Sequence, residues 1–285
     1  MKPQTAPLDA GLYLVATPIG NARDITLRAL DTLASADVIA AEDTRTARKL
    51  MDIHGVALSG RKMIPYHDHS SQAARAGIAK LISDGKSVAY VSEAGSPLIA
   101  DPGFALAREL VAQGHMVTAI PGPSATLAAL SLSGLPTDRF LFAGFPPSTK
   151  GARAKWLAEL LPIPATLVFF ESPKRIQKLL GELCSSGQGT RQAAICRELT
   201  KKFEEVKRGT VAELTEGLEK NPIKGEIVVV LNRAAEVQDE GAMEDMLKHA
   251  MQDMSMKDAV NAVSNALGLP RRKVYQAALE LGKAK

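Results

Sequence analysis

Short, continuously apolar segments alternate with helical patterns over the first 120 residues of the chain. The apolar segments predict five strands, at residues 12–16, 38–41, 63–65, 87–91 and 116–120. The stretches between them predict four helices, at residues 27–34, 44–51, 73–83 and 104–112. Strands that are apolar throughout are buried on both faces, which is typical of a parallel sheet covered by helices. We therefore expect an α/β domain over residues 1–122, with its ligand at the carboxyl ends of the strands.

A second series of elements follows the Pro-Gly-Pro-Ser turn at residues 121–124. Its strands are expected at residues 140–144, 166–170, 193–197, 203–209 and 227–231. Its helices are expected at residues 125–132, 152–160, 173–184 and 211–220. The short connection before residues 203–209 favours antiparallel pairing of two consecutive strands, which indicates an α+β organisation. We expect this second domain to cover residues 123–235.

The last part of the chain, residues 236–285, has no strand pattern. Ser255 is suited to cap a helix that runs to Leu267, and a second helix is expected over residues 271–281 after a Gly-Leu-Pro break. The pair predicts a small helix-turn-helix-like module. The alternative is an ordinary helical hairpin docked on the rest of the protein.

The overall composition is that of a folded globular protein, with 46% hydrophobic and 23% charged residues among 285. A net charge of +4 permits contact with an anionic polymer without requiring it. Aromatic residues are only 4%, which argues against a binding platform of stacked rings. Any contact with RNA should therefore depend on basic side chains.

Compartment and membrane contact follow from equally simple features. The two cysteines, Cys184 and Cys196, have no redox or zinc spacing, and we expect them to be buried apolar fillers in a reduced compartment. The N-terminal segment lacks the apolar stretch of a signal peptide, and no segment approaches the ~20 apolar residues that span a bilayer. We expect a cytoplasmic protein with no membrane contact.

Three loops attract attention because each follows a predicted strand and is rich in small residues. They cover residues 17–21, 92–103 and 121–125. The first is neither a dinucleotide-binding fingerprint nor a phosphate-binding loop, so the usual nucleotide sites have no local support. Small residues let a ligand approach the backbone closely. If the three strands are neighbours in the sheet, the loops converge on one ligand site. Asp101 in the second loop has an alternative role as the N-cap of the following helix.

Six ordered segments resemble the tetrapyrrole-methylase-like superfamily of class III S-adenosylmethionine-dependent methyltransferases. They are VATPIGN (15–21), AEDTR (41–45), SEAGSPLIADPG (92–103), PGPSA (121–125), FFESPKRI (169–176) and RELTKKFEEVKRGT (197–210). Within it, the chain resembles the bacterial branch that methylates the ribose 2′-oxygen of a cytidine in small-subunit ribosomal RNA near the decoding centre. Tetrapyrrole methylases proper have a glycine-richer first loop. The first loop of this chain, residues 17–21, departs from that glycine-rich pattern. This difference weakens the alternative that the protein is a small-molecule methyltransferase.

The resemblance implies a two-lobed fold that holds S-adenosyl-L-methionine in the cleft between the two halves. It places the following residues beside this cofactor: Pro18, Ser92, Glu93, Ala94, Gly95, Ser96, Asp101, Ser124, Ala125, Phe170 and Glu171. It also implies a homodimer that acts on small-subunit ribosomal RNA. The substrate is either the free RNA or an assembled 30S particle, and a nucleotide presented by folded RNA favours the particle, which holds that RNA in shape. A non-catalytic RNA-binding module is the alternative from another class, and it would not bind S-adenosylmethionine.

Methyl transfer to a hydroxyl is an in-line displacement, for which positioning alone supplies much of the acceleration. We hypothesise that Glu42 and Arg45 position the acceptor nucleotide; the alternative is an ordinary pair of charges at a helix start. His67 and His69 fit polar or RNA-facing loop positions better than metal ligands, and no metal site is expected.

Basic residues are expected to contact RNA phosphates, although most basic runs are simply solvated faces. The candidates are Lys150, Arg153, Lys155, Lys174, Arg175, Arg271, Arg272 and Lys273.

Overall fold

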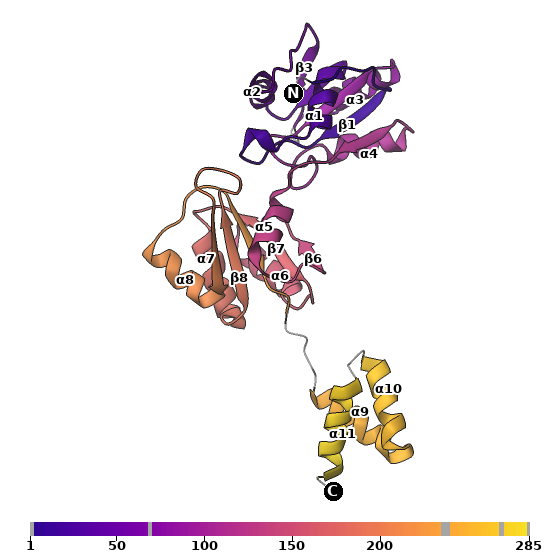
Figure 1. Ribbon diagram of the computed structural model, residues 1–285, viewed down its shortest axis with the longest axis vertical. Coiled ribbons are helices and arrows are strands. Elements are labelled where there is room, and N and C mark those ends of the chain that lie inside the picture. The colour runs from indigo at the N-terminus through magenta and orange to yellow at the C-terminus, as the bar shows by residue number, and fades with distance from the viewer. Residues whose placement is uncertain (1–2, 68–69, 235–239, 268–270, 284–285) are drawn as a thin grey trace. The chain divides into compact units, whose positions relative to one another are not determined.

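The computed structural model describes residues 3–67, 70–234, 240–267 and 271–283. The chain forms two compact units, Met1–Ala234 and Ala235–Lys285. The first unit contains two sheets, each with its own helices, and the second contains helices within its described residues (Figure 1). A division of the first unit near residue 122 stays a prediction.

The first sheet is parallel throughout, as the apolar pattern predicted. Its strands are β1 (Gly11–Val15), β2 (Val38–Ala41), β3 (Lys62–Pro65), β4 (Ser87–Val91) and β5 (Val117–Ile120). They lie in the order β3-β2-β4-β1-β5. In the register of β1, Leu12 is opposite Val88 of β4 on one side and Val117 of β5 on the other. β1 is therefore flanked by the two strands whose following loops were predicted to bind a ligand.

Alternating residues of these strands face two separate apolar layers. The helices are α1 (Leu27–Ser35), α2 (Thr44–Ile53), α3 (Gln72–Ser83) and α4 (Phe104–Ala112), with a short η1 (Ala22–Asp24) before α1. Leu33 and Met51 of α1 and α2 pack with Val15 on one face. Ile78 and Leu106 of α3 and α4 belong to the layer on the other face. The hydroxyl of Thr26 accepts from the N–H of Ala29 at 3.1 Å and so caps α1.

The second sheet is mixed, with the order β6-β7-β10-β8-β9. Its strands are β6 (Phe140–Phe142), β7 (Thr166–Glu171), β8 (Gln192–Arg197), β9 (Glu205–Thr210) and β10 (Ile227–Leu231). β8 and β9 pair antiparallel, as their short connection predicted, and only β6 and β7 are parallel. β9 begins two residues later than expected because the backbone turns between Glu198 and Glu204.

Helices cover both faces of this sheet as well. They are α5 (Ala125–Ser133), α6 (Lys150–Leu160), α7 (Ile176–Leu183), η2 (Cys184–Gln188) and α8 (Val211–Lys220). Ala129 and Leu130 of α5 pack on one face of the sheet. Residues of α6, α7 and α8 pack on the other, around Phe169. The loop after β5 thus leads directly from the first sheet into a helix that packs on the second.

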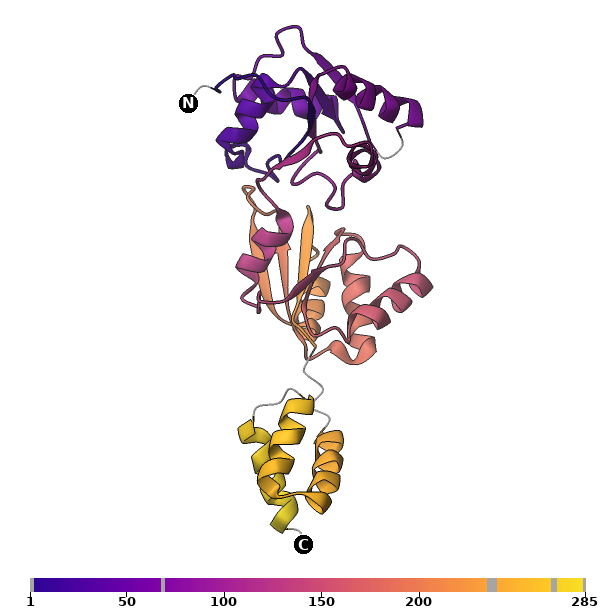
Figure 2. The same ribbon diagram turned by 90° about the vertical axis from the view of Figure 1, so that its right-hand side faces the viewer.

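The second unit has α9 (Glu240–Asp253), α10 (Met256–Leu267) and α11 (Arg271–Lys283), which pack side by side (Figure 2). Leu247, Val260 and Val274 form its own apolar core. The Ser255 hydroxyl accepts from the N–H of Asp258 at 3.2 Å, so the predicted cap of α10 is confirmed. In the described part of the chain, every helix is too short or too polar to cross a membrane.

Candidate functional site

The three small-residue loops converge at one edge of the first sheet. Strands β4, β1 and β5 are adjacent, so the loops that follow them begin side by side. Thr17 and Gly95 exchange backbone hydrogen bonds of 2.8 and 3.0 Å. The Ser96 hydroxyl donates to the carbonyl of Pro123 at 3.4 Å. The predicted convergence of the loops is confirmed.

A cavity of ≈ 560 Å³ lies where these loops meet residues of the second sheet. Nine residues predicted to bind the cofactor line it: Pro18, Glu93, Ala94, Gly95, Ser96, Asp101, Ser124, Ala125 and Phe170. Several other lining residues were not predicted from the sequence, among them Thr46, Ile99, Thr126, Phe145, Lys201 and Glu226. The size is suited to a ligand of cofactor dimensions.

A second, strongly apolar hollow of ≈ 300 Å³ adjoins this cavity. The two share Ile19, Ala125, Phe145, Phe170 and Glu226 as walls. Cys196 also lines the hollow, and burial raises the pKa of its thiol to about 11, so the thiol is neutral. Its expected role as a buried filler is confirmed, and the hollow offers a flat ring an apolar environment.

Two predicted cofactor residues have other positions. Ser92 is buried behind the cavity, where its hydroxyl lies 3.5 Å from the carbonyls of Ala94 and Gly95. Glu171 lines the apolar hollow and not the larger cavity. Asp101 lines the cavity, and α4 has Gly103 as its N-cap with no side-chain hydrogen bond. The N-cap position of this helix is therefore held by Gly103 and not by Asp101.

The first loop also contacts the second sheet's side of the cavity. The N–H of Asn21 donates to the hydroxyl of Thr200 at 3.0 Å. A Cβ at Gly20 would lie 2.5 Å from Lys201 Cγ and 2.7 Å from Thr200 Oγ1. Only glycine allows this close approach.

Glu42 and Arg45 lie at the start of α2, beside the cavity and outside its lining. The Glu42 carboxylate accepts from the N–H of Glu93 at 3.0 Å, which ties the end of β2 to the second loop. Arg45 pairs with Asp43 at 2.9 Å, and its side chain is 90% exposed. Asp43 caps α2 by accepting from the N–H of Arg45 at 2.7 Å. Hydrogen bonds from Arg45 lower the pKa of Asp43 to about 2.

The predicted RNA-contacting residues divide into two groups. Lys150, Lys155 and Lys174 are exposed, as are Arg271 and Arg272 at the start of α11, whereas the side chain of Lys273 lies outside the described residues. Arg153 is only 2% exposed.

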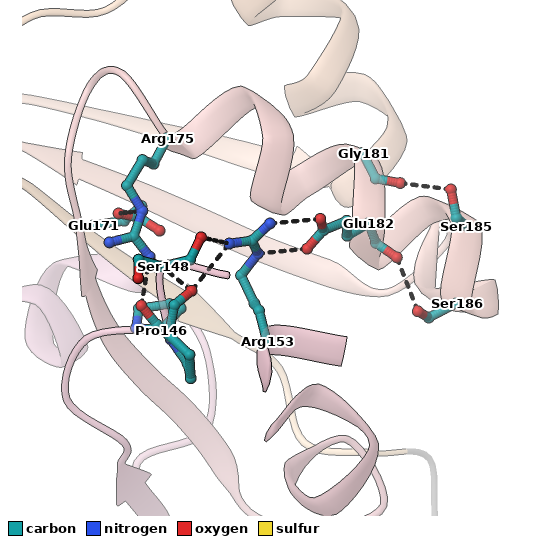
Figure 3. A network of polar contacts seen from close by, with 10 residues as sticks. Pro146, Ser148, Arg153, Glu171, Arg175, Gly181, Glu182, Ser185 and Ser186 are labelled. Carbon is teal, nitrogen blue, oxygen red and sulfur yellow. Dashed lines mark hydrogen bonds and ion pairs between the residues drawn. The ribbon is translucent and has the colours of Figure 1, made fainter. Parts of the chain in front are cut away.

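Arg153 is held by Glu182, with N–O distances of 2.5 and 2.6 Å (Figure 3). A guanidinium enclosed by a carboxylate and backbone carbonyls cannot reach a phosphate. The predicted contact of Arg153 with RNA is therefore wrong. Arg175, one third exposed, makes an ion pair of 3.3 Å with Glu171 in the same view.

The histidines and possible metal ligands form no site among the described residues. His67 is exposed, and His69 lies outside the described residues. Among the described residues, no group of three or more His, Cys, Asp or Glu could hold a metal ion. A shallow groove beside α2, which the sequence analysis missed, is lined by Arg45, Arg48 and Lys49.

Comparison with known proteins places this geometry in a family. Residues 11–215 match the family model of Tetrapyrrole (Corrin/Porphyrin) Methylases, and residues 237–282 match that of the RsmI C-terminal HTH domain. A protein of Mesorhizobium japonicum named ribosomal RNA small subunit methyltransferase I is 46% identical over 96% of this chain and 93% of its own. The chain belongs to the ribosomal RNA small subunit methyltransferase I family. A relative of the same name from Erythrobacter litoralis is 45% identical over 96% of both chains.

Solved structures agree with the fold of this family. A diphthine synthase superposes with a TM-score of 0.60 at 17% identity, covering 78% of this chain and 89% of that one. A uroporphyrin-III C-methyltransferase of Thermus thermophilus, complexed with S-adenosylhomocysteine, superposes with a TM-score of 0.54 at 20% identity. It covers 78% of this chain and 97% of that one. These likenesses confirm the predicted two-lobed class III methyltransferase fold.

Proposed function

We propose that this protein transfers a methyl group from S-adenosyl-L-methionine to the ribose 2′-hydroxyl of a cytidine in small-subunit (16S) ribosomal RNA near the decoding centre. The observation that carries the proposal is the cavity at the converging loops, in a chain whose relatives are named ribosomal RNA small subunit methyltransferase I. The methyl acceptor follows from the resemblance described above and from those names.

The residues of the cavity suit this cofactor. Glu93, Asp101 and Glu226 line it, and carboxylates attract a cationic sulfonium. Among the described residues, the buried hydroxyls of Thr17 and Thr126 have no hydrogen-bond partner. Thr126 lines the cavity, so its hydroxyl is available to a polar ligand. The adjoining apolar hollow suits the adenine ring. The walls have no phosphate cradle, and this cofactor needs none.

S-adenosylmethionine supplies an electrophilic methyl carbon when bound. The 2′-oxygen would take this methyl group, S-adenosylhomocysteine would be the leaving group, and the hydroxyl proton would pass to solvent. The chain must hold the oxygen ~3–3.5 Å from the carbon along the line of the breaking bond. Glu42 stabilises the second loop through the N–H of Glu93, and Arg45 extends from α2 beside the cavity. We assign these two residues the positioning of the acceptor nucleotide.

The exposed cations provide the contact with RNA in this proposal. Lys150, Lys155 and Lys174 belong to the first unit, and Arg271 and Arg272 to the second. Lys273, whose side chain lies outside the described residues, is proposed as a further RNA contact on its position in the sequence alone. The groove of Arg45, Arg48 and Lys49 adds cations on the helix whose Thr46 lines the cavity. Phosphate contacts of this kind make binding depend on salt. The expected substrate is the RNA within a 30S particle, in the cytoplasm.

A homodimer is part of the same proposal. Phe104, Val111 and Leu127 expose more than half of their surface on α4 and α5. Large exposed apolar side chains favour contact with another protein surface. Light scattering of the purified protein, with Val111→Lys as the disrupting variant, tests the pairing. A monomer in the unsubstituted protein would contradict it.

The decisive experiment is transfer of radiolabelled methyl from S-adenosylmethionine to unmethylated small subunits, followed by nuclease digestion and mass spectrometry of the nucleosides. The expected product is 2′-O-methylcytidine. Binding of cofactor without label in RNA would favour a small-molecule acceptor instead. Binding of RNA without binding of cofactor would identify a non-catalytic RNA-binding module.

A further inference from the structure

The loop between β6 and α6, residues 143–149, forms one wall of both hollows. Phe145 lines the large cavity and the apolar hollow, and 57% of its surface is exposed. Its ring packs edge-on against Phe170 with 5.4 Å between centroids, and Phe142 lies 4.9 Å from the same ring. The position of Phe145 therefore sets the shape of the cavity.

This loop has few backbone N–H groups with which to form its own hydrogen bonds. After Gly144, whose carbonyl accepts from the N–H of Phe170 at 2.9 Å, the chain leaves the sheet. Pro146 and Pro147 have no N–H, so their peptide groups offer only carbonyl oxygens. Buried carbonyls need donors from elsewhere.

Two guanidinium groups supply these donors to three successive carbonyls. Arg175 donates to the carbonyls of Pro146 and Pro147, the latter at 3.1 Å. Arg153 donates to the carbonyls of Pro147 and Ser148 at 2.9 and 3.0 Å. Arg153 lies in α6, and Arg175 is the N-cap residue of α7. The loop is therefore held by side chains from two different helices (Figure 3).

Each guanidinium is itself aligned by a carboxylate. Glu182 on α7 holds Arg153 with two hydrogen bonds, and Arg153 in turn lowers the pKa of Glu182. Glu171, 3% exposed at the end of β7, pairs with Arg175 and also accepts from the N–H of Ser172 at 2.8 Å. The planar fork of arginine suits such simultaneous contacts, and a lysine cannot reproduce them.

We propose that Arg153 and Arg175 form an arginine clasp that positions Phe145 as a wall of the cofactor cavity. Both arginines are positioning residues, because they act through the loop and not on the ligand. The identity of the ligand, S-adenosylmethionine, rests on the proposed function. The clasp gives a different role to two basic residues whose sequence context predicted contact with RNA.

The test measures cofactor affinity separately from turnover and from RNA binding. Isothermal titration with S-adenosylhomocysteine is carried out on the full chain and on Arg175→Lys, Arg175→Gln and Phe145→Ala. We expect about a tenfold weaker Kd for Arg175→Gln, since two loop carbonyls lose their donor. Arg175→Lys keeps the charge and loses the fork, so it should remain weakened. In the methyl-transfer assay, KM for the cofactor should rise while kcat changes less than threefold.

A double-mutant cycle shows whether Arg175 acts through Phe145. If it does, Arg175→Gln weakens the Phe145→Ala protein by less than threefold, because the wall is already removed. Fully independent effects would overturn the clasp. So would a decrease in the salt dependence of RNA binding for Arg175→Gln, since that is the signature of a lost phosphate contact.

Two controls distinguish the clasp from a general effect of removing an arginine and from a failure of the proposed function. Arg233 pairs with Asp138 through two hydrogen bonds of 2.8 and 3.2 Å outside the loop, so Arg233→Gln should leave the cofactor Kd unchanged. Unaltered Kd values for all clasp variants, in an unsubstituted protein that binds S-adenosylhomocysteine, would overturn the clasp alone. Failure of the unsubstituted protein to bind would instead reject the proposed function.

Discussion

Asp43 is the residue on which the start of α2 depends. Its carboxylate accepts from the N–H groups of Arg45 and Thr46 at 2.7 and 3.4 Å and pairs with the Arg45 side chain. The resulting pKa of about 2 lies below the ordinary value near 3.8. A lowered pKa means that the native state favours the charged carboxylate. Its contribution is therefore complete above the unfolded pKa and is lost as the pH falls toward 2.

We predict that the Asp43 carboxyl titrates near pH 2 in carbon-detected NMR. Arg45→Gln should move its pKa up toward the ordinary value, because the side-chain hydrogen bond is the largest cause of the shift. Arg48→Gln, on the same helix but paired with Asp52, is the matched control and should leave it in place. An Asp43 that titrates near pH 4 in the unsubstituted protein would contradict the capping geometry.

The buried ion pair of Arg153 with Glu182 leads to a prediction about the free energy of unfolding. Its side chain is 3% exposed, and its Glu182 partner is 19% exposed. Removing one partner of a buried pair strands the other charge, so Arg153→Met should lower the free energy of unfolding by about 3 kcal/mol, the low end of the usual range. Urea unfolding provides the measurement. The double variant Arg153→Met, Glu182→Leu should recover part of the loss, and an unchanged midpoint for Arg153→Met would contradict the burial.

The sequence could not separate Arg153 from Lys150, because both stand in one basic segment. Their difference depends on Glu182, 29 positions away, which only the fold brings next to Arg153. Thr17 and Thr126 were missed for a similar reason. A buried hydroxyl without a partner is a property of packing and leaves no local signal.

At the scale of elements, the apolar pattern of the sequence was sufficient to predict where the strands of the two sheets lie. Strands such as β4 and β10 are buried along their whole length and were predicted at their observed positions. The loops after β1, β4 and β5 were predictable as a site because parallel neighbours end at one edge. Phe145 was not predictable, because its place depends on the course of an irregular loop and on long-range donors. Nothing in its immediate sequence marks a cavity wall.

The junction between the second loop and α4 depends on Gly103. Its φ is +114°, and a Cβ there would lie 2.7 Å from Tyr90 Cε1 and 2.9 Å from Leu98 Cδ2. Gly103→Ala should lower the free energy of unfolding by about 3 kcal/mol or more, from backbone strain and overpacking together. Gly114→Ala is the matched control, since its φ is +76° and no atom lies within 4 Å. It should cost about 1 kcal/mol, and equal urea midpoints for the two would contradict this account.

At the scale of the whole molecule, the two units divide the apolar cores cleanly. The four buried clusters of the first unit contain only residues up to Leu231. The fifth cluster, around Leu247 and Val263, belongs to α9, α10 and α11. The cofactor cavity is lined by the first unit alone. Cofactor binding and the proposed RNA contact of the helical unit are therefore separable.

Truncation after Ala234 tests that separation. The shortened chain keeps every residue of the cavity, so its Kd for S-adenosylhomocysteine should stay within twofold of the full chain's. Its affinity for small-subunit RNA should fall, with a smaller slope against the logarithm of salt concentration, because the cations at the start of α11 are gone. The full-length variant Arg271→Gln, Arg272→Gln is the matched control, since it removes two exposed charges and leaves the helices in place. It should reproduce most of the change in slope. If truncation lowers RNA affinity while this variant does not, the unit contributes through its shape and not through these two arginines; if neither lowers it, RNA binds through the first unit alone.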